Sequence, residues 1–437
     1  MKIRNILMMA VLVSLFACKP ELDDFTTTSG DADFSKYVAL GNSLTAGYAD
    51  AELYRSGQEN SYPAILAMQF EAAGGGDFKQ PLMLDELGFG SRLLLDASLP
   101  GPVPAGGTPD PANMESIAAQ GPFNNMGVPG AKTFHLITDG YGALNPYYGR
   151  FASSATASVL ADAAAQQPTF FTCWIGANDV LTYAIAGGAA DSITDINTFG
   201  YAVDLILQQM TAGGAKGAIA NIPDITSIPY FTFMNTQLQY NFLTLTEQAQ
   251  VDALNQGYAE LNEVIKSLGS TDTLAFSLGQ NPFVIVDKSL PWGIRQMNEN
   301  DLFLLSLPTD SVQNHGYGSQ IPIPDDYVLS TNEQTDIQTA IDAYNVTLAN
   351  LATTYDLAFV DMRDKLMQVA TGGIEYDGIN FTSEFISGNA FSLDGVHLTA
   401  QGYAMTANFF IDAINSKYGS QLTHVSPRLY PGIYYYE

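Results

Sequence analysis

The chain has 437 residues, 46% of them hydrophobic, and carries 45 acidic residues against 17 lysines and arginines. The net charge of −28 disfavours nucleic acid as a partner, because phosphate backbones demand basic surfaces. The length alone suggests two or three domains, and the only cysteines, Cys18 and Cys173, offer no pattern of paired disulfides.

Residues 1–17 are predicted to be a lipoprotein signal peptide. Lys2 and Arg4 precede an apolar run over 6–17 that is too short to span a bilayer comfortably. The stretch LFAC (15–18) resembles a bacterial lipobox, and this resemblance implies cleavage before Cys18 and a membrane anchor through lipid on that residue. A plain signal peptide with a chance cysteine is the alternative.

Residues 18–34 are acidic and aperiodic, which predicts a flexible tether. They resemble the acidic export signals that follow the cysteine in surface lipoproteins of Bacteroidetes-type bacteria. The expected location is therefore the bacterial outer membrane, with exposure at the cell surface and the membrane leaflet left open.

Short apolar runs and helical patterns alternate along the rest of the chain, and this order predicts a doubly wound α/β layer fold. The predicted strands are 36–41, 123–128, 169–176, 216–222 and 357–362. The predicted helices are 61–73, 152–167, 195–212, 246–268, 332–354 and 400–417. Cys173, between aromatic residues in the third strand, is expected to be a small buried hydrophobe. Two long segments interrupt this pattern and are predicted to be insertions. They are about 74–122, which is rich in Gly and Pro, and about 270–330, and both are candidates for building a substrate cleft.

Ser43 stands directly after the first predicted strand, in LGNSLTAGY (40–48). A serine attacks efficiently only with a base, a group that orients the base, and donors for the oxyanion. The segment SLDGVHLTAQGY (392–403) offers Asp394 and His397, three residues apart and able to lie on one side of a helical turn. His135, His315 and His424 are expected to be surface or structural residues, with His135 kept as a minor candidate for substrate contact.

Two further segments could supply oxyanion donors. In NNMGVPGAKT (124–133), Gly127 and Gly130 bracket a tight turn where a backbone N–H could face a ligand. In WIGANDV (174–180), Asn178 follows the carboxyl end of a predicted strand, where ligands bind in open α/β sheets. Taken singly, each segment is explained as well by an ordinary turn or helix cap.

Several other site types are not indicated by the sequence. It contains no G-x-S-x-G around Ser43, no H-E-x-x-H, no Cys/His cluster and no P-loop lysine. We therefore predict neither a metal nor a cofactor.

The four segments GNSLTAGY, NNMGVPGA, GANDV and DGVHLTAQGY resemble, in order, the four blocks of the SGNH (GDSL-type) esterase and lipase superfamily. The resemblance implies a three-layer α/β/α, flavodoxin-like fold with a mostly parallel five-stranded sheet. It also implies roles for five residues. Ser43 matches the nucleophile, His397 the general base and acid, and Asp394 the group that orients His397. The backbone N–H of Ser43, the N–H of Gly130 and the side chain of Asn178 match the oxyanion hole.

The match leaves a choice between two glycines and departs from the family at Asn42. Gly130 is preferred to Gly127 because the family's glycine enters the turn that here reads GAKT. The usual Gly-Asp-Ser of the first block is Gly41-Asn42-Ser43 here, so one negative charge beside the nucleophile is missing. Asn42 can still cap the following helix.

The resulting expectation is a serine esterase or acylhydrolase that cleaves carboxylic esters, either lipid acyl esters or acetylated glycans. Ser43 and His397 must meet, so residues 35–437 are predicted to form one domain with two insertions. An acyltransferase with the same triad and a non-catalytic binding lipoprotein are the alternatives. The sequence does not indicate an oligomeric state.

Overall fold

The computed structural model describes residues 27–99, 101–236, 243–433 and 435–436. The predicted signal peptide, Cys18 and the first part of the predicted tether lie outside these residues. Within the described ranges, no helix has both the length and the apolar character needed to cross a membrane.

Five parallel strands form the central sheet, in the order β13-β6-β5-β1-β4. Each of the five predicted strands is present. Their bounds are β1 (Tyr37–Gly41), β4 (Asn125–Gly127), β5 (Phe170–Trp174), β6 (Lys216–Ala220) and β13 (Ala358–Val360). Since the strands are parallel, their carboxyl ends share one edge of the sheet, and three of the four sequence blocks contain the carboxyl end of a strand or the turn that follows it.

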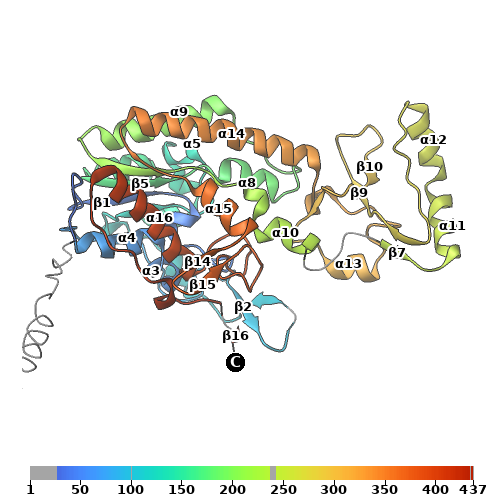
Figure 1. Cartoon of the computed structure of the whole chain (residues 1–437), viewed down its shortest axis with the longest axis horizontal. Coiled ribbons are helices and arrows are strands. Elements are labelled where there is room, and N and C mark those ends of the chain that lie inside the picture. The colour runs from blue at the N-terminus through green and yellow to red at the C-terminus, as the bar shows by residue number, and fades with distance from the viewer. Residues whose placement is uncertain (1–26, 100, 237–242, 434, 437) are drawn as a thin grey trace, which may run out of the picture.

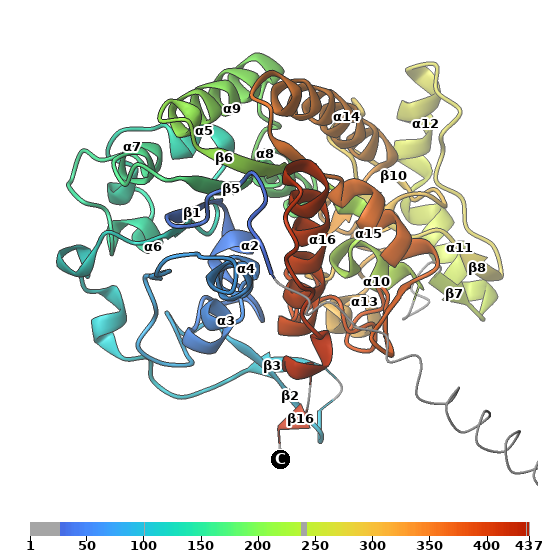
Figure 2. The ribbon, with the colours of Figure 1, turned by 60° about the vertical axis from the view of Figure 1, so that its left-hand side comes forward.

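Alternate residues of β1 enter two separate hydrophobic cores, as the two-residue period of a strand requires. In β1, Val38 and Leu40 join one core, while Tyr37 and Ala39 join the other. The first core is covered by α7 (Val159–Ala164), α9 (Ile196–Thr211) and α14 (Thr331–Thr354). The second is covered by α4 (Tyr62–Glu71) and α16 (Ala400–Tyr418). These helices lie on opposite sides of the sheet (Figures 1 and 2), so the predicted three-layer α/β/α fold is confirmed.

Local signals explain where the two longest of these helices begin. Ser330 and Glu333 form a capping box at the start of α14, and the Thr399 hydroxyl accepts from Gly402 N at the start of α16. Short elements complete this part of the chain: α2 (Ser43–Ala46), α3 (Arg55–Glu59), α5 (Thr133–Leu136), α6 (Pro146–Gly149), α8 (Asn178–Ala184), α10 (Pro229–Thr236), α15 (Met362–Thr371), β14 (Ile374–Tyr376) and β15 (Ile379–Phe381).

A lobe projects from the α/β layers beyond α10 (Figure 1). It has two small apolar cores of its own, one of which joins Val251 and Ile265 to Phe276. The elements are β7 (Leu243–Leu245), α11 (Gln248–Gly257), α12 (Ala259–Ser267), β8 (Gly279–Asn281), β9 (Val284–Val286), β10 (Ile294–Gln296), β11 (Leu302–Phe303), α13 (Thr309–Asn314) and β12 (Val328–Leu329).

The segment predicted as one helix over 246–268 is helical with one break, but it belongs to the lobe. The segment forms two helices, α11 and α12, which meet at Tyr258. Both pack inside the lobe instead of on the sheet. An amphipathic pattern shows that a helix has an apolar face but does not show which core that face covers.

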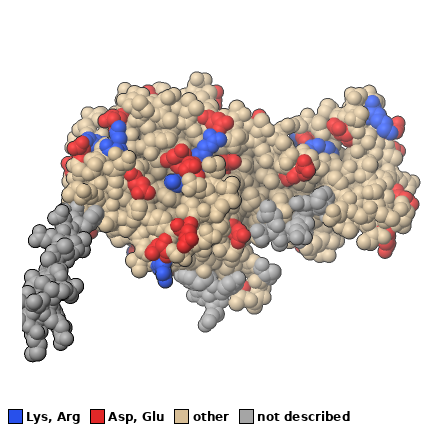
Figure 3. All heavy atoms as spheres, in the orientation of Figure 1, with Lys and Arg blue, Asp and Glu red and all other residues tan. Residues whose placement is uncertain are grey.

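The first insertion contains a hairpin that the C-terminal segment extends. Strands β2 (Leu93–Asp96) and β3 (Pro102–Pro104) are antiparallel, and β16 (Tyr435–Tyr436) adds to β2 in parallel. Charged side chains are scattered over the face shown in Figure 3, with broad uncharged areas between them.

Candidate active site

Ser43 is the first residue of α2, immediately beyond the carboxyl end of β1. Asn42 caps this helix, because its Oδ1 accepts from Leu44 N at 3.0 Å. An amide oxygen performs this task as a carboxylate would, so the departure from Asp leaves the turn intact. A Cβ at Gly41 would lie 2.0 Å from Thr45 Oγ1, so only glycine allows the strand to turn this sharply into the helix.

His397 and Asp394 come from the loop that leads into α16, at the other end of the chain. His397 Nε2 lies 2.8 Å from Ser43 Oγ. His397 Nδ1 lies 2.9 Å from Asp394 Oδ2. The three side chains predicted from the sequence thus form one continuous hydrogen-bonded relay.

The Asp394 carboxylate accepts five hydrogen bonds. Ser392 Oγ and the backbone N–H groups of Val396 and His397 donate to Oδ1. Ala51 N and His397 Nδ1 donate to Oδ2. Burial by itself would raise the pKa of Asp394, but the adjacent His397 and these donors together hold that pKa well below its ordinary value. The carboxylate therefore stays ionised and oriented toward the imidazole.

Gly130 and Asn178 both reach the space beside Ser43 and His397. Asn178 opens α8, is 5% exposed, and donates through Nδ2 to Ala131 O at 3.0 Å. That bond uses one of the two amide hydrogens and orients the other. Gly130 has φ 77°, a left-handed conformation that glycine adopts without strain.

Gly127, the other glycine of this turn, has a different task. A Cβ at Gly127 would lie 2.3 Å from Ala46 N, so the residue allows β4 to pack closely against α2. It does not line the space beside Ser43. The geometry thus agrees with Gly130 as the glycine of the site.

Asp179 is a residue that the sequence reasoning missed. It is fully buried, and its carboxylate accepts from Thr133 N at 2.9 Å and from Thr133 Oγ1 at 2.7 Å. Burial raises the pKa of Asp179, and the hydrogen bonds from Thr133 lessen this increase. The contact joins the GANDV segment to the GAKT segment and so sets Asn178 relative to Gly130. The sequence singles out both segments, but nothing in the residues near Thr133 or Asp179 indicates that these two side chains are partners.

A sequence model of the GDSL-like lipase/acylhydrolase family matches residues 37–410 of the chain. The chain belongs to this family. It is accordingly a hydrolase that acts on esters. A search of curated proteins found no match.

Solved structures similar to this GDSL hydrolase include three lipases or acylhydrolases, each 12% identical to it in sequence. One is a GDSL-like lipase from Parabacteroides merdae, described as putative (89% of this chain, 99% of that chain, TM-score 0.35). The others are the lipase/acylhydrolase from Enterococcus faecalis (89% and 99%, TM-score 0.34) and an extracellular lipase from Streptomyces rimosus (87% and 98%, TM-score 0.34).

Two pockets of the GDSL hydrolase meet at Ser43, Asn178 and His397. The first, which we call the inner pocket, measures about 780 Å³ including the open space at its mouth. Apart from Asn42, Ser43, Asn178, Lys365, His397 and Thr406, its walls are apolar: Leu44, Trp174, Ala177, Leu181, Pro223, Ile225, Ile228, Met362, Leu366, Val369, Ala390, Phe391, Val396, Leu398, Met405 and Phe409.

The second, which we call the outer pocket, measures about 920 Å³ and is more open. Gly130 and the rings of Tyr48, Tyr147 and Tyr230 line it. The Tyr48 ring lies 4.5 Å from that of His397, centroid to centroid.

The predicted insertions line neither of these two pockets, contrary to the expectation that they build the cleft. They support the outer pocket from behind: Phe89 stacks on Tyr147 at 4.7 Å, and Leu305 N donates to Tyr230 O at 2.8 Å. Tyr230 N in turn donates to Gly395 O at 3.0 Å. The base of the lobe is therefore joined to the loop that carries Asp394 and His397.

The remaining histidines and Cys173 line neither of these two pockets. His135 stacks on Tyr141 and accepts from Lys132 N through Nδ1. His315 and His424 pair with carboxylates on the surface. Cys173 is buried as expected, and burial raises the pKa of its thiol to about 12. Within the described residues, no group of three or more potential metal ligands is brought together.

Proposed function

We propose that this GDSL hydrolase cleaves carboxylic esters with Ser43 as nucleophile. The observation that carries the proposal is the relay from Ser43 Oγ through His397 to Asp394, with contacts of 2.8 and 2.9 Å, at the junction of two pockets. A binding protein without catalysis would not need this relay, so its completeness speaks against the non-catalytic alternative.

The proposed reaction has two halves. His397 Nε2 takes the proton from Ser43 Oγ as that oxygen attacks the acyl carbon, and Asp394 stabilises the resulting imidazolium. The oxyanion accepts from Ser43 N–H, Gly130 N–H and Asn178 Nδ2. His397 then gives its proton to the departing alcohol oxygen, which leaves an acyl ester on Ser43. Water then attacks this ester while His397 takes a proton from it, the acyl–Oγ bond breaks, and His397 returns the proton to Ser43 Oγ as the acid is released.

The inner pocket suits the acyl chain. Its apolar walls would leave an acetyl group largely without contacts, whereas each methylene of a longer chain that they bury contributes about 0.8 kcal/mol. This favours medium or longer acyl esters over acetylated glycans. The outer pocket, lined by tyrosine rings and without Lys or Arg among the described residues, suits an uncharged alcohol.

The test is turnover of p-nitrophenyl esters of increasing chain length by the wild type and Ser43→Ala. We expect kcat/KM to rise about fourfold per methylene until the inner pocket is filled, as 0.8 kcal/mol implies. Ser43→Ala should be inactive at every length. Equal rates for the two proteins would refute the nucleophile, and a maximum at acetate would refute the assignment of the inner pocket. Product analysis with added alcohol separates hydrolysis from acyl transfer, since a transferase yields a new ester.

We further propose that Cys18 carries the lipid anchor expected from the LFAC segment, with the protein attached to the bacterial outer membrane. Metabolic labelling with a radioactive fatty acid should mark the wild type but not Cys18→Ala. Equal labelling of both proteins would overturn this assignment.

A further inference from the structure

A two-residue turn between Ala49 and Glu52 has an unusual backbone. Asp50 has φ 52° and Ala51 has φ 64°, and the residues on either side exchange hydrogen bonds of 3.1 and 3.0 Å. Turns with two left-handed residues are typically Asn-Gly or Asp-Gly, because a Cβ disfavours this conformation. Alanine at the second position indicates that contacts outside the turn hold it in place.

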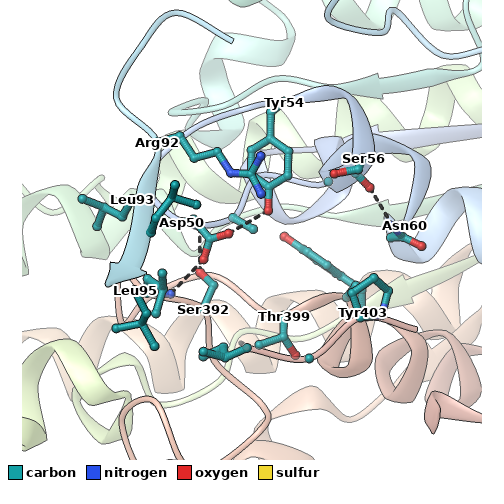
Figure 4. A pocket seen from close by; sticks show the side chains of 18 residues that line it. Asp50, Tyr54, Ser56, Asn60, Arg92, Leu93, Leu95, Ser392, Thr399 and Tyr403 are labelled. Atoms are coloured by element: carbon teal, nitrogen blue, oxygen red, sulfur yellow. Dashed lines mark hydrogen bonds between the residues drawn. The ribbon is translucent and has the colours of Figure 1, made fainter. Parts of the chain in front are cut away.

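Three of those contacts lead to the loop that carries Asp394. Two others come from elsewhere, since Leu93 N donates to Asp50 O at 2.8 Å and Tyr48 OH donates to Ala51 O at 2.5 Å. Asp50 N donates to Ser392 Oγ at 3.0 Å, and Leu393 N donates to Asp50 Oδ1 at 3.1 Å (Figure 4). Ala51 N donates to Asp394 Oδ2 at 2.9 Å. The Ser392 hydroxyl donates onward to Asp394 Oδ1 at 3.1 Å.

The Asp50 carboxylate is itself held from the opposite side. Tyr54 OH donates to its Oδ2 at 2.8 Å, and Cζ of the Arg92 guanidinium lies over the Tyr54 ring, 3.7 Å from its centroid (Figure 4). A pocket of about 660 Å³ opens beside these three side chains and Ser392. Water in this pocket could replace a missing Asp50 carboxylate, so a truncated side chain there is expected to be compatible with folding.

The position of this turn in the chain matters for the relay. It follows Ser43 by only seven residues, whereas Asp394 lies more than three hundred residues away. Of the donors to Asp394 in the described chain, four come from its own loop, and Ala51 N alone comes from the Ser43 side. The turn therefore fixes the position of the Asp394 carboxylate relative to the segment that carries Ser43.

We propose that the Asp50–Ala51 turn is a positioning element for catalysis, and that Asp50 is its principal side chain. Asp50 touches no reacting atom. It holds Ala51 N–H and Ser392 against Asp394, which keeps His397 in line with Ser43. The inference rests on the proposed function, since it requires the Ser43 relay to be catalytic.

The test compares Asp50→Ala, Asp50→Asn and Asp162→Ala on one p-nitrophenyl ester. Asp162 is a matched control, because its carboxylate also accepts from a tyrosine hydroxyl (Tyr148, 2.8 Å) and a backbone N–H (Ser153, 3.0 Å), on α7 and outside both active-site pockets. We expect Asp50→Ala to lower kcat about 10- to 100-fold with KM unchanged, as a displacement of about 1 Å in a catalytic group can do. Asp50→Asn, which keeps the acceptor and tolerates the left-handed backbone, should restore most of kcat, and Asp162→Ala should retain it.

Wild-type kcat for folded Asp50→Ala, or an equal loss in Asp162→Ala, would overturn the positioning role. Should Asp50→Ala fail to fold, Ser392→Ala answers the same question. It removes the hydroxyl between the turn and Asp394, and we expect kcat to fall with KM unchanged. Full activity of that variant would contradict the proposal. Equal turnover by the wild type and Ser43→Ala would overturn the proposed function instead, and that result is obtained without any Asp50 variant.

Discussion

Replacement of Asn178 by alanine tests the oxyanion hole most directly. One amide hydrogen of Asn178 is engaged with Ala131 O at 3.0 Å, which leaves the other for the substrate oxyanion. Loss of one such donor typically raises the barrier by about 2.7–4 kcal/mol, and kcat should therefore fall about 100- to 1000-fold. The donor acts mainly in the transition state, so KM should change little.

The assay is steady-state hydrolysis of one p-nitrophenyl ester at several concentrations, with circular dichroism to confirm folding. The lost bond to Ala131 O should cost only about 1 kcal/mol of stability, so the variant should remain folded. Asn408→Ala is the matched control, because that buried amide also donates to a carbonyl oxygen, Val425 O at 2.9 Å, on α16 and outside both pockets. If folded Asn178→Ala keeps more than about a tenth of the wild-type kcat, the donor role is refuted, since the expected loss is at least 100-fold.

Three further predictions concern residues around the relay. Asp394→Asn should lower kcat about 10⁴-fold, because an amide no longer selects the tautomer of His397 that accepts from serine. The pKa of Asp394 is held below its unfolded value of about 4, so the ionised carboxylate stabilises the fold above that pH and less as pH falls through the lowered pKa. Urea titration gives the free energy of unfolding of the wild type and of Asp394→Asn. The difference between these two free energies should become smaller as the pH is lowered, and a constant difference would contradict this reasoning. Leu366→Trp should reduce kcat/KM for long acyl esters but not short ones, whereas Leu351→Trp, outside both pockets, should not change this chain-length profile. Ala51→Gly should raise the melting temperature through about 1 kcal/mol of relieved strain, and a lower melting temperature would argue against strain in the turn.

The strands of the sheet could be predicted because a buried parallel strand is apolar along its whole length. All five predicted segments contain a strand of the sheet, although β4 reads Asn-Met-Gly and is not an apolar run, and Cys173 is buried in β5 as expected. The site residues could be named because the four blocks that contain them resemble, in order, the blocks of the SGNH (GDSL-type) superfamily. The capping role of Asn42 could also be predicted, because a cap and the N–H group that it accepts from are only two positions apart in the sequence.

Contacts between distant segments could not be predicted in this way. The pairing of Asp179 with Thr133 and the link from Ala51 to Asp394 join residues whose side chains give no sign of their partners. The helices at 248–267 show the same limit, because their apolar faces would have suited either the sheet or the lobe.

The sequence by itself thus determined the alternation of strands and helices, the family resemblance and the residues expected to act, since each depends on local pattern and spacing. The tertiary structure alone decided that His397 lies 2.8 Å from Ser43, that two pockets meet there, and that a strained turn ties Asp394 to the nucleophile's side of the chain. These features arise from packing of segments more than three hundred residues apart, where the distance between two side chains is set by the whole core and not by their neighbours in sequence.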